Sequence, residues 1–553
     1  MKFGEIDTAD ALGAILAHSV RLTGRALKKG RVLERDDIAA LLGAGHPVIA
    51  AARLEADDVH EDEAARRVAA PLCGDGLTVN APFTGRVNLY AAHDGILRVD
   101  AAAVARLNAV DEAITLATLA PWAWVDERQL LGTVKIIPFS APGSAVAEAA
   151  RIAASAPMAV ARATLTRIGL IQTLLPDTRA AVLDKTTRVL GERARSVGAA
   201  IVREARCAHR AGAVAGAVRE QLAAGCEMVL IAGASAIVDR RDVVPSGIEA
   251  AGGEVIHFGM PVDPGNLVLM AAAQGKPVVG LPGCARSPAF NGFDWVLQRL
   301  AAGIEVGSDA LTAMGAGGLL KEGAARPSPR EVYAHGGRKE QRRALARAPR
   351  IAALVLAAGQ SRRMGERNKL AAALGGSPMV RHSVQAIARS KASPVVVVTG
   401  FEPQRVTAAL ADLAVRLVHN PAFGEGLSTS LAAGIASLEA GDEDAEGVVV
   451  CLADMPLVAP AIIDQLIAAY DPVEGREICV PAWRGKRGNP VLFGARFFAA
   501  MRRVKGDVGA RHLLSEHEEL ICEVAVDDHC ILEDVDSPPD LERMQARFVG
   551  ADP

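Results

Sequence analysis

Short apolar segments alternate with amphipathic ones through the middle of the chain. TLTRIGLIQT at 164–173 and EMVLIAGAS at 227–235 have the continuous apolar character of buried strands. Residues 177–198 between them have the spacing of an amphipathic helix, and KPVVGLPG at 276–283 is again strand-like. Strands that alternate with helices in this way indicate βαβ units around a parallel sheet. We therefore predict a doubly wound α/β domain over residues 161–310.

The same alternation returns in the C-terminal part of the chain. The strand-like segments there, separated by helical ones, are IAALVLAAG (351–359), PVVVVTG (394–400), VRLVHN (415–420), GVVVCLAD (447–454) and EICVPAW (477–483). In open sheets of this type, ligands bind outside the carboxyl ends of the strands. We predict a second Rossmann-like, three-layer α/β domain over residues 350–548, with its site at that edge.

The first 140 residues follow a less regular pattern. Strand-like runs such as HPVIAAARL (46–54) and GRVNLYAA (85–92) are mixed with short helical stretches and Gly-rich turns, which predicts a small α+β region of one domain or two subdomains. HEDEAARR at 60–67 is interpreted as a charged helix surface rather than a metal site. We assign no chemistry to residues 1–140.

A segment rich in Gly, Pro, Ala and Arg at 315–349 separates the two α/β patterns. Its composition predicts a solvated linker. An electrostatic contact between its arginines and an anionic partner is the alternative interpretation.

Composition and charge narrow the class of protein. A formal net charge of −3 over 553 residues argues against a general nucleic-acid binder, which needs a basic surface. No apolar run approaches the roughly 20 residues that span a bilayer, and the N-terminus has no apolar signal core. The eight scattered cysteines show no zinc-site spacing and are expected to be free thiols. We expect a cytoplasmic protein that binds neither membranes nor nucleic acids.

The strongest chemical signal follows the strand Ala353 to Leu356. The loop Leu-Ala-Ala-Gly-Gln-Ser-Arg-Arg-Met-Gly at 356–365 has glycines that let the backbone approach a ligand and supply unusual dihedral angles. Successive amide N–H groups in such a loop bind anions. Arg363 and Lys369 can neutralise a triphosphate, and Ser361 can donate to one of its oxygens. An ordinary strand-to-helix turn with solvated basic residues is the alternative.

Two acidic side chains are predicted to hold Mg²⁺ near this loop. Asp454 follows the strand Val448 to Leu452, ahead of a helix expected to start at Pro456. Asp536, in the turn-rich segment Asp534 to Asp540, offers a second carboxylate. Carboxylates, together with phosphate oxygens and water, are usual ligands of Mg²⁺. Either aspartate taken alone is better explained by helix capping or turn formation.

These segments occur in the order of a known set of motifs. LAAGxSxRMG…K, NxxFxxGxSxS, DMP, GNPxxF, GDxGAR and DxDSPxD, spread over Ile351 to Phe548, resemble the motifs of the molybdenum cofactor nucleotidyltransferases. The LAAG form, with Ala358, is similar to the cytidylyltransferase (MocA-like) branch, whereas the guanylyltransferase branch usually reads LAGG. The resemblance implies transfer of CMP from CTP to the phosphate of Mo-molybdopterin, which releases pyrophosphate and gives molybdopterin cytosine dinucleotide.

The resemblance also assigns residues to that reaction. It implies Lys369, Arg363 and Asp454 as catalytic residues, with Asp454 and Asp536 as ligands of Mg²⁺. The nucleotide-binding residues that it implies are Leu356, Ala357, Ala358, Gly359, Ser361, Gly365, Lys369, Gly400, Ser428 and Asp454. On the molybdopterin side it implies Asn420, Gly488, Asn489, Asp507 and Arg511.

A second resemblance covers about Thr164 to Gly303. IAGASAIVDRRDVVP at 231–245 and GLPG at 280–283 resemble the TGGTG…RDVTPE and GLPGNPVS patterns of the MoeA- and MogA-like molybdopterin-binding domains. The resemblance implies a molybdopterin site at Gly233, Ser235, Asp242, Pro282 and Gly283. Departures at Ala234, at Cys284 to Arg286, and at His209-Arg210, where the family tends to place an acid, favour binding without hydrolysis. A bare α/β domain without a ligand is the alternative.

Two classes of function remain open at this point. One is a bifunctional enzyme whose middle domain binds molybdopterin and raises its effective concentration for cytidylylation by the C-terminal domain. The other is a non-catalytic cofactor-binding chaperone, which would not need Lys369, Asp454 and Asp536 together. A guanylyltransferase on the same cofactor, and a sugar or isoprenoid nucleotidyltransferase, are further alternatives. Besides small-molecule substrates, we expect transient contact with a molybdoenzyme or its cofactor-insertion chaperone.

Overall fold

The computed structural model describes residues 1–22, 25–320, 347–360, 368–441, 444–472, 474–504 and 511–549. The N-terminal part forms a small three-stranded antiparallel sheet in the order β1-β5-β2, beside a hairpin of β3 and β4. Its elements are β1 (Lys2–Asp7), β2 (Ile15–Leu16), β3 (Val20–Leu22), β4 (Arg25–Leu27), α1 (Arg35–Gly43) and β5 (Val48–Arg53). A small apolar cluster that includes Leu16, Leu33 and Leu41 is its core.

A second region contains two antiparallel sheets around one apolar core. The sheets have the strand orders β10-β12-β8-β7 and β11-β9-β14. Its elements are β6 (Asp58–His60), α2 (Glu61–Leu72), β7 (Leu77–Val79), β8 (Arg86–Ala91), β9 (Gly95–Arg98), α3 (Ala101–Asn108), β10 (Ile114–Thr118), β11 (Trp124–Val125), β12 (Leu130–Ile136), β13 (Ser140–Pro142), α4 (Gly143–Ser155) and β14 (Ala159–Arg162). Because β14 pairs with β9, this region extends beyond residue 140 to Arg162.

The middle region is a mixed sheet with helices on both faces, in the strand order β16-β15-β17-β20-β19-β18. The first four strands in this order are parallel, while β19 and β18 are antiparallel to their neighbours. Its elements are β15 (Arg167–Leu174), α5 (Ala180–Ser196), β16 (Ala200–Ala208), α6 (Ala211–Ala223), β17 (Met228–Ala232), α7 (Val243–Ala250), β18 (Glu254–Phe258), β19 (Leu269–Ala273), β20 (Lys276–Gly280), α8 (Gly292–Ala301) and α9 (Ser308–Thr312).

The C-terminal region has the same three-layer architecture around an eight-stranded sheet. The strand order is β25-β24-β21-β26-β29-β27-β28, and β30 also pairs with β27. Its elements are β21 (Ile351–Ala357), β22 (Ala373–Leu374), β23 (Ser377–Pro378), α12 (Met379–Ala388), β24 (Val395–Thr399), α13 (Pro403–Ala409), β25 (Arg416–His419), α14 (Leu427–Glu439), β26 (Gly447–Leu452), α15 (Pro460–Ala469), β27 (Ile478–Trp483), β28 (Lys486–Arg487), β29 (Val491–Gly494), α16 (Phe498–Met501), α17 (Arg511–Glu516), β30 (Ile521–Ala525) and α18 (Pro538–Val549).

Alternating side chains explain why helices cover both faces of the C-terminal sheet. In β21, Val355 points into the apolar cluster beneath α12 and α15, while Leu354 and Leu356 point into the cluster beneath α14. A strand that is buried on both faces reads as a continuous apolar run, which is the signal that predicted it. The predicted α/β fold is therefore confirmed. The helix expected to start at Pro456 begins instead at Pro460, after a turn.

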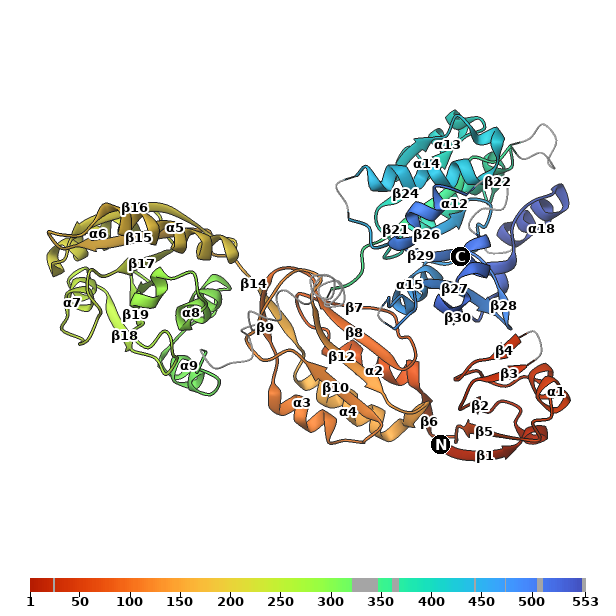
Figure 1. The fold of residues 1–553 in the computed structure, drawn as a ribbon, viewed down its shortest axis with the longest axis horizontal. Helices are drawn as coiled ribbons and strands as arrows, with labels where there is room; N and C mark the ends of the chain where they lie inside the picture. The colour runs from red at the N-terminus through yellow and green to blue at the C-terminus, as the bar shows by residue number, and fades with distance from the viewer. Residues whose placement is uncertain are drawn as a thin grey trace.

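The second region lies between the two larger α/β regions (Figure 1). Phe83, in the turn before β8, packs against the apolar cluster of the C-terminal sheet. Arg347, at the end of the linker, pairs with Asp126 at 2.6 Å. Within the described ranges, every helix is too short or too polar to cross a bilayer.

Candidate active site

Three strand ends meet at one edge of the C-terminal sheet. The parallel strands β21, β24 and β26 are in register, so that Ala357 is opposite Thr399 and Leu356 is opposite Leu452. The loop after β21, Gly400 and Asp454 therefore emerge side by side. Parallel strands bring the residues that follow them to a common edge, which is where open α/β sheets bind ligands.

Gly400 lies against the start of the loop that follows β21. A Cβ atom on Gly400 would lie 2.7 Å from Cβ of Ala358 and 2.6 Å from Cβ of Phe423. Phe401 N donates to Ala358 O at 3.3 Å. Since real Cβ atoms do not approach this closely, only glycine lets the three segments meet. Leu356, Ala357 and Ala358 are themselves buried.

Lys369 lies between the two predicted metal ligands. Its Nζ donates to Asp454 Oδ2 at 2.6 Å and to Asp536 Oδ1 at 2.9 Å. The lysine begins a short 3-10 turn, and the side chain of buried Asn368 caps that turn, with its Oδ1 accepting from Leu370 N at 3.1 Å. Asp454 and Asp536, which are 85 and 167 positions from Lys369 in the sequence, thus both contact its ammonium group.

The backbone positions Asp536 beside Asp454. Val535 N donates to Asp454 O at 3.1 Å, which fixes the segment before α18 against the end of β26. The turn after Asp536 is closed by Asp540, whose carboxylate accepts from Ser537 N at 2.8 Å. The two carboxylates therefore reach Lys369 from segments that the main chain itself ties together.

The charges at this edge influence one another. Burial opposes the charged form of Lys369, but attraction to Asp454 and Asp536 outweighs it and raises the pKa of the ammonium group. Burial, followed by repulsion from Asp536 and Asp454, raises the pKa of Asp534. The sequence did not single out Asp534 for a role of its own; its position two residues before Asp536 was the available signal.

The two carboxylates fit a divalent cation. Asp454 and Asp536 converge on one point, which the Lys369 ammonium occupies as a cation. Among the described residues, no three His, Cys, Asp or Glu side chains form a cluster suited to a metal ion. Two carboxylates, completed by phosphate oxygens and water, nevertheless match the way Mg²⁺ is commonly bound to nucleotides.

Several predicted residues contribute less than expected or cannot be placed. The φ angle of Gly359 is not positive, and a Cβ there would meet nothing within 4 Å, which leaves its backbone open to a ligand. Ser361, Arg363, Gly365 and Asp507 lie outside the described residues, and of Arg511 only the backbone, at the start of α17, is described.

Asn420 organises the start of α14 next to the loop. Its side chain is buried, donates to Thr429 Oγ1 at 2.9 Å and Ser430 Oγ at 3.0 Å, and accepts from Ala422 N at 3.0 Å. Ser428 is buried in the first turn of the same helix. The amide of Asn420 is thus used to hold the helix terminus, which can present its N–H groups to an anion.

Gly488 has a packing role. Gly488 N donates to Pro481 O and Asn489 N donates to Ile531 O, each at 2.9 Å. A Cβ on Gly488 would lie 2.3 Å from Ile531 O, so no larger residue fits without a backbone shift. Because Ile531 shortly precedes Asp534 and Asp536, this contact supports the segment that carries the second carboxylate.

We expect Gly488→Ala to lower the free energy of unfolding of the C-terminal domain by about 1–3 kcal/mol, because the added methyl group overpacks against the Ile531 backbone. Thermal unfolding of the full chain measures the effect. Gly216→Ala in α6 is the matched control, since a Cβ there meets nothing within 4 Å. Equal unfolding temperatures for the two variants would contradict the packing role.

The middle domain gathers polar groups at the carboxyl ends of its parallel strands. The His209 ring bridges two hydroxyl groups, with Nδ1 2.9 Å from Thr173 Oγ1 and Nε2 3.2 Å from Ser235 Oγ. Ala234 N also donates to Thr173 Oγ1 at 2.7 Å. These residues follow or end β15, β16 and β17, so the site is built in the same way as the edge of the C-terminal sheet. Thr173 was not anticipated from the sequence.

The other predicted residues of the middle domain have mixed roles. Gly233 O accepts from Arg286 Nη2 at 2.5 Å, which ties the turn after β20, with Pro282 and Gly283, to the end of β17. A Cβ on Gly283 would meet nothing within 4 Å. Asp242 caps α7 and accepts from Val243 N at 2.7 Å and Val238 N at 3.2 Å, so it holds a helix terminus.

Separate parts of the chain match known families. Residues 353–520 match a family described as MobA-like NTP transferase domain, and residues 170–302 match one described as probable molybdopterin binding domain. Residues 5–53 match a domain of unknown function. The chain thus combines a nucleotidyltransferase domain with a domain of the molybdopterin-binding type.

Individual proteins are similar over about a third of the chain or less. Purine catabolism protein PucB of Bacillus subtilis is 28% identical over 36% of this chain and 98% of its own. The probable molybdenum cofactor guanylyltransferase of Pyrococcus furiosus is 33% identical over 23% of this chain and 59% of its own. A solved nucleotidyl transferase from Methanothermobacter thermautotroptrophicus is 23% identical and covers 37% of this chain and 99% of that one, with a TM-score of 0.33. The family match over residues 353–520 supports a transferase.

Proposed function

We propose that the C-terminal domain transfers CMP from CTP to the phosphate of Mo-molybdopterin, with Mg²⁺, and that the middle domain binds molybdopterin. The observation that carries the proposal is the meeting of Lys369 Nζ with Asp454 and Asp536 at the strand-end edge beside the 357–360 loop. Cation and carboxylates at one edge are what a magnesium-bound triphosphate requires.

The reaction needs positioning and charge more than covalent chemistry. An oxygen of the acceptor phosphate attacks the α-phosphorus of CTP, a new phosphorus–oxygen bond forms, and the bond to the β-phosphate breaks to release pyrophosphate. Lys369 would pair with the charge that develops on the α-phosphate and the leaving group. Asp454 and Asp536 would hold Mg²⁺, which supplies positive charge to the phosphate oxygens when bound.

Lys369 would change partners when the nucleotide enters. Its ammonium group is held by two carboxylates, 2.6 and 2.9 Å away, at the position where a cation is needed. A triphosphate offers new anionic partners to Lys369, and its movement would free Asp454 and Asp536 for Mg²⁺. The raised pKa of Lys369 keeps the group charged, and therefore able to pair with phosphate, throughout the neutral range.

The proposal of CTP rests on the resemblance of the LAAG loop to the cytidylyltransferase branch. Ala358 is buried with its Cβ near Gly400, so the residue that differs between the two branches faces a neighbouring strand end. GTP is the second candidate, and the similarity to a relative named as a guanylyltransferase favours it. A pure binding chaperone would not need a lysine held between two converging carboxylates.

For the middle domain, we propose molybdopterin binding without hydrolysis. His209, in place of the acid expected from the resemblance, is joined to Thr173 and Ser235. The ring N–H of an imidazole can donate to a phosphate oxygen, whereas an imidazole cannot take the place of a carboxylate that holds a metal ion and its water.

A nucleotide panel tests the proposal directly. The full-length protein is mixed with Mg²⁺, molybdenum cofactor freshly released under anaerobic conditions, and CTP, GTP, ATP or UTP in turn. We expect pyrophosphate and a cytidine-capped product with CTP, at least about tenfold faster than with the other nucleotides. If GTP is preferred, the assignment of CTP is wrong, but the proposed nucleotidyl transfer still holds. Binding of the cofactor without pyrophosphate from any nucleotide would favour the chaperone.

A further inference from the structure

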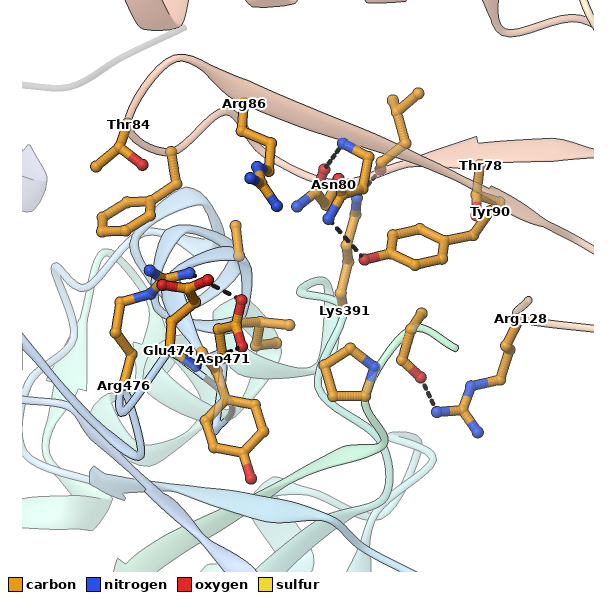
Figure 2. Close-up of a pocket in the computed structure, with 18 of the residues that line it drawn as sticks. Thr78, Asn80, Thr84, Arg86, Tyr90, Arg128, Lys391, Asp471, Glu474 and Arg476 are labelled. Carbon is orange, nitrogen blue, oxygen red and sulfur yellow. Dashed lines mark hydrogen bonds and ion pairs between the residues drawn. The ribbon is translucent and has the colours of Figure 1, made fainter. Parts of the chain in front are cut away.

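A cavity of about 470 Å³ lies between the second region and the C-terminal domain (Figure 2). One wall comes from β7, β8 and the turn between them, and the other from the end of α15, the segment that follows it and the loop after α12. None of the residues that line it belongs to the proposed nucleotidyl-transfer site. Its volume lies in the range of small-molecule sites, which often form between domains.

The cavity is positively charged although the whole chain is slightly acidic. Five Arg and Lys side chains line it against two carboxylates, Asp471 and Glu474, an excess of three positive charges. Part of this charge is already paired, because Arg476 contacts Asp471 at 3.1 Å and Lys135 contacts Glu61, outside the lining, at 3.7 Å. Arg128 donates to Ala348 O and Lys391 donates to Val79 O, both of them neutral carbonyls, although Glu446, outside the lining, also attracts Arg128.

Arg86 is the cation most available to a ligand. It extends from β8 toward the opposite wall, which carries Asp471, Glu474 and Arg476 (Figure 2). Among the residues that the structure describes, its guanidinium has neither an ion pair nor a hydrogen bond. A planar guanidinium with unused donors is well suited to a phosphate group, which it can bind through two oxygens at once.

The remaining lining offers a place for a planar ring. Tyr90, Pro349 and Ile467 contribute apolar surface, and Tyr90 is fixed because its hydroxyl accepts from Asn88 Nδ2 at 3.1 Å. The side-chain Oδ1 of Asn80 accepts from Asn88 N at 2.6 Å. Its Nδ2 has no partner within the described ranges and can donate to a ring carbonyl. An apolar surface with a few fixed polar groups is typical of sites for heterocycles.

We propose that this cavity binds a phosphorylated planar heterocycle of nucleotide size, with its phosphate at Arg86 and Lys391 and its ring against Tyr90. Because Lys391 and Val79 stand on opposite walls, a bound ligand joins the second region to the C-terminal domain. The inference is independent of nucleotidyl transfer, since it concerns separate residues and a binding event alone.

The experiment follows the reactivity of Lys391 in the full-length protein. An N-hydroxysuccinimide ester acylates the lysines, and peptide mass spectrometry measures the extent at Lys391 without and with CMP, phosphorylated hydroxymethylpterin, inorganic phosphate or cytidine. We expect one or both phosphate esters to protect Lys391, and neither cytidine nor inorganic phosphate to do so at the same concentration. The two esters distinguish a nucleotide from a pterin as the source of the heterocycle. Lys276, outside the cavity, is the internal control for reagent activity.

Variants locate the binding event. Arg86→Ala should weaken binding, so that roughly tenfold more of the phosphate ester is needed to protect Lys391. A tenfold change corresponds to the loss of one charge-assisted contact. Arg98→Ala, an exposed arginine of β9 in the same region, should leave protection unchanged. The proposal would be overturned if neither phosphate ester reduced the acylation of Lys391. It would also be overturned if Lys391 were protected equally well in Arg86→Ala and in the unchanged protein. Equal protection by inorganic phosphate would overturn the assignment of the ring.

Discussion

Replacing Asp454 by asparagine is expected to slow pyrophosphate release from CTP and the molybdenum cofactor by about a thousandfold. Asparagine keeps the shape of the side chain but removes the charge that attracts Lys369 from 2.6 Å and that would hold Mg²⁺. The fold should persist, because Lys369 keeps Asp536 as a partner and Asp454 O still accepts from Val535 N. Single-turnover pyrophosphate release over a range of Mg²⁺ concentrations measures the effect.

Asp527→Asn is the matched control for this variant. Asp527 is an exposed carboxylate of the same domain, after β30, so its neutralisation should leave both turnover and the Mg²⁺ dependence unchanged. Thermal unfolding of both variants separates a loss of chemistry from a loss of structure. Full turnover of Asp454→Asn with the ordinary Mg²⁺ dependence would refute the metal assignment.

Local pattern was sufficient to predict the strands that carry the site. β21, β24 and β26 are buried on both faces, so each is a continuous apolar run whose end is easy to recognise in the sequence. Since parallel strands end at one edge, Asp454 could be placed near the 357–360 loop without a structure. HEDEAARR, predicted as a helix surface, lies mostly in α2.

Contacts between distant segments could not be predicted in the same way. The motif order suggested that Lys369 and Asp536 act together, but nothing local shows that one ammonium group lies between two carboxylates. The requirement for Gly488 depends on Ile531 O, which is remote in sequence, and Gly400 is needed because Phe423 and Ala358 approach it. Such glycines resemble loop glycines until the partner is known.

The arrangement of the second region was also hidden in the sequence. Its strands are short and pair antiparallel out of sequence order, so that β14 joins β9 and β12 joins β8. Register of this kind is set by side chains on a shared core rather than by the pattern within one strand. The cavity near Arg86 depends further on how Phe83 packs against the C-terminal domain.

The second large effect concerns the stability of the middle domain. Arg193 of α5 is buried, with Nε donating to Asp294 Oδ1 at 2.7 Å and Nη1 donating to Ser287 O at 2.7 Å. Nη2 donates to Ala289 O at 2.7 Å. One guanidinium therefore joins α5, α8 and the turn after β20, which includes Pro282 and Gly283.

Arg193→Met should lower the free energy of unfolding of the middle domain by about 3–5 kcal/mol, because it leaves the Asp294 carboxylate buried without its counter-ion and the turn carbonyls without donors. Denaturant unfolding, with hydrogen exchange to assign the loss to β15, β17 and β20, measures it. Arg195→Met on the exposed face of the same helix is the control.

Adding Asp294→Asn to Arg193→Met should recover part of the loss. Asparagine removes the unpaired charge, yet its carbonyl can still accept from Asn291 N, the contact at 2.8 Å that starts α8. Pyrophosphate release by the C-terminal domain should stay near the original rate in all of these variants, since Lys369, Asp454 and Asp536 belong to another core. A loss for Arg193→Met no larger than that for Arg195→Met would show that the buried pair contributes little, as well-packed apolar replacements of buried ion pairs sometimes reveal.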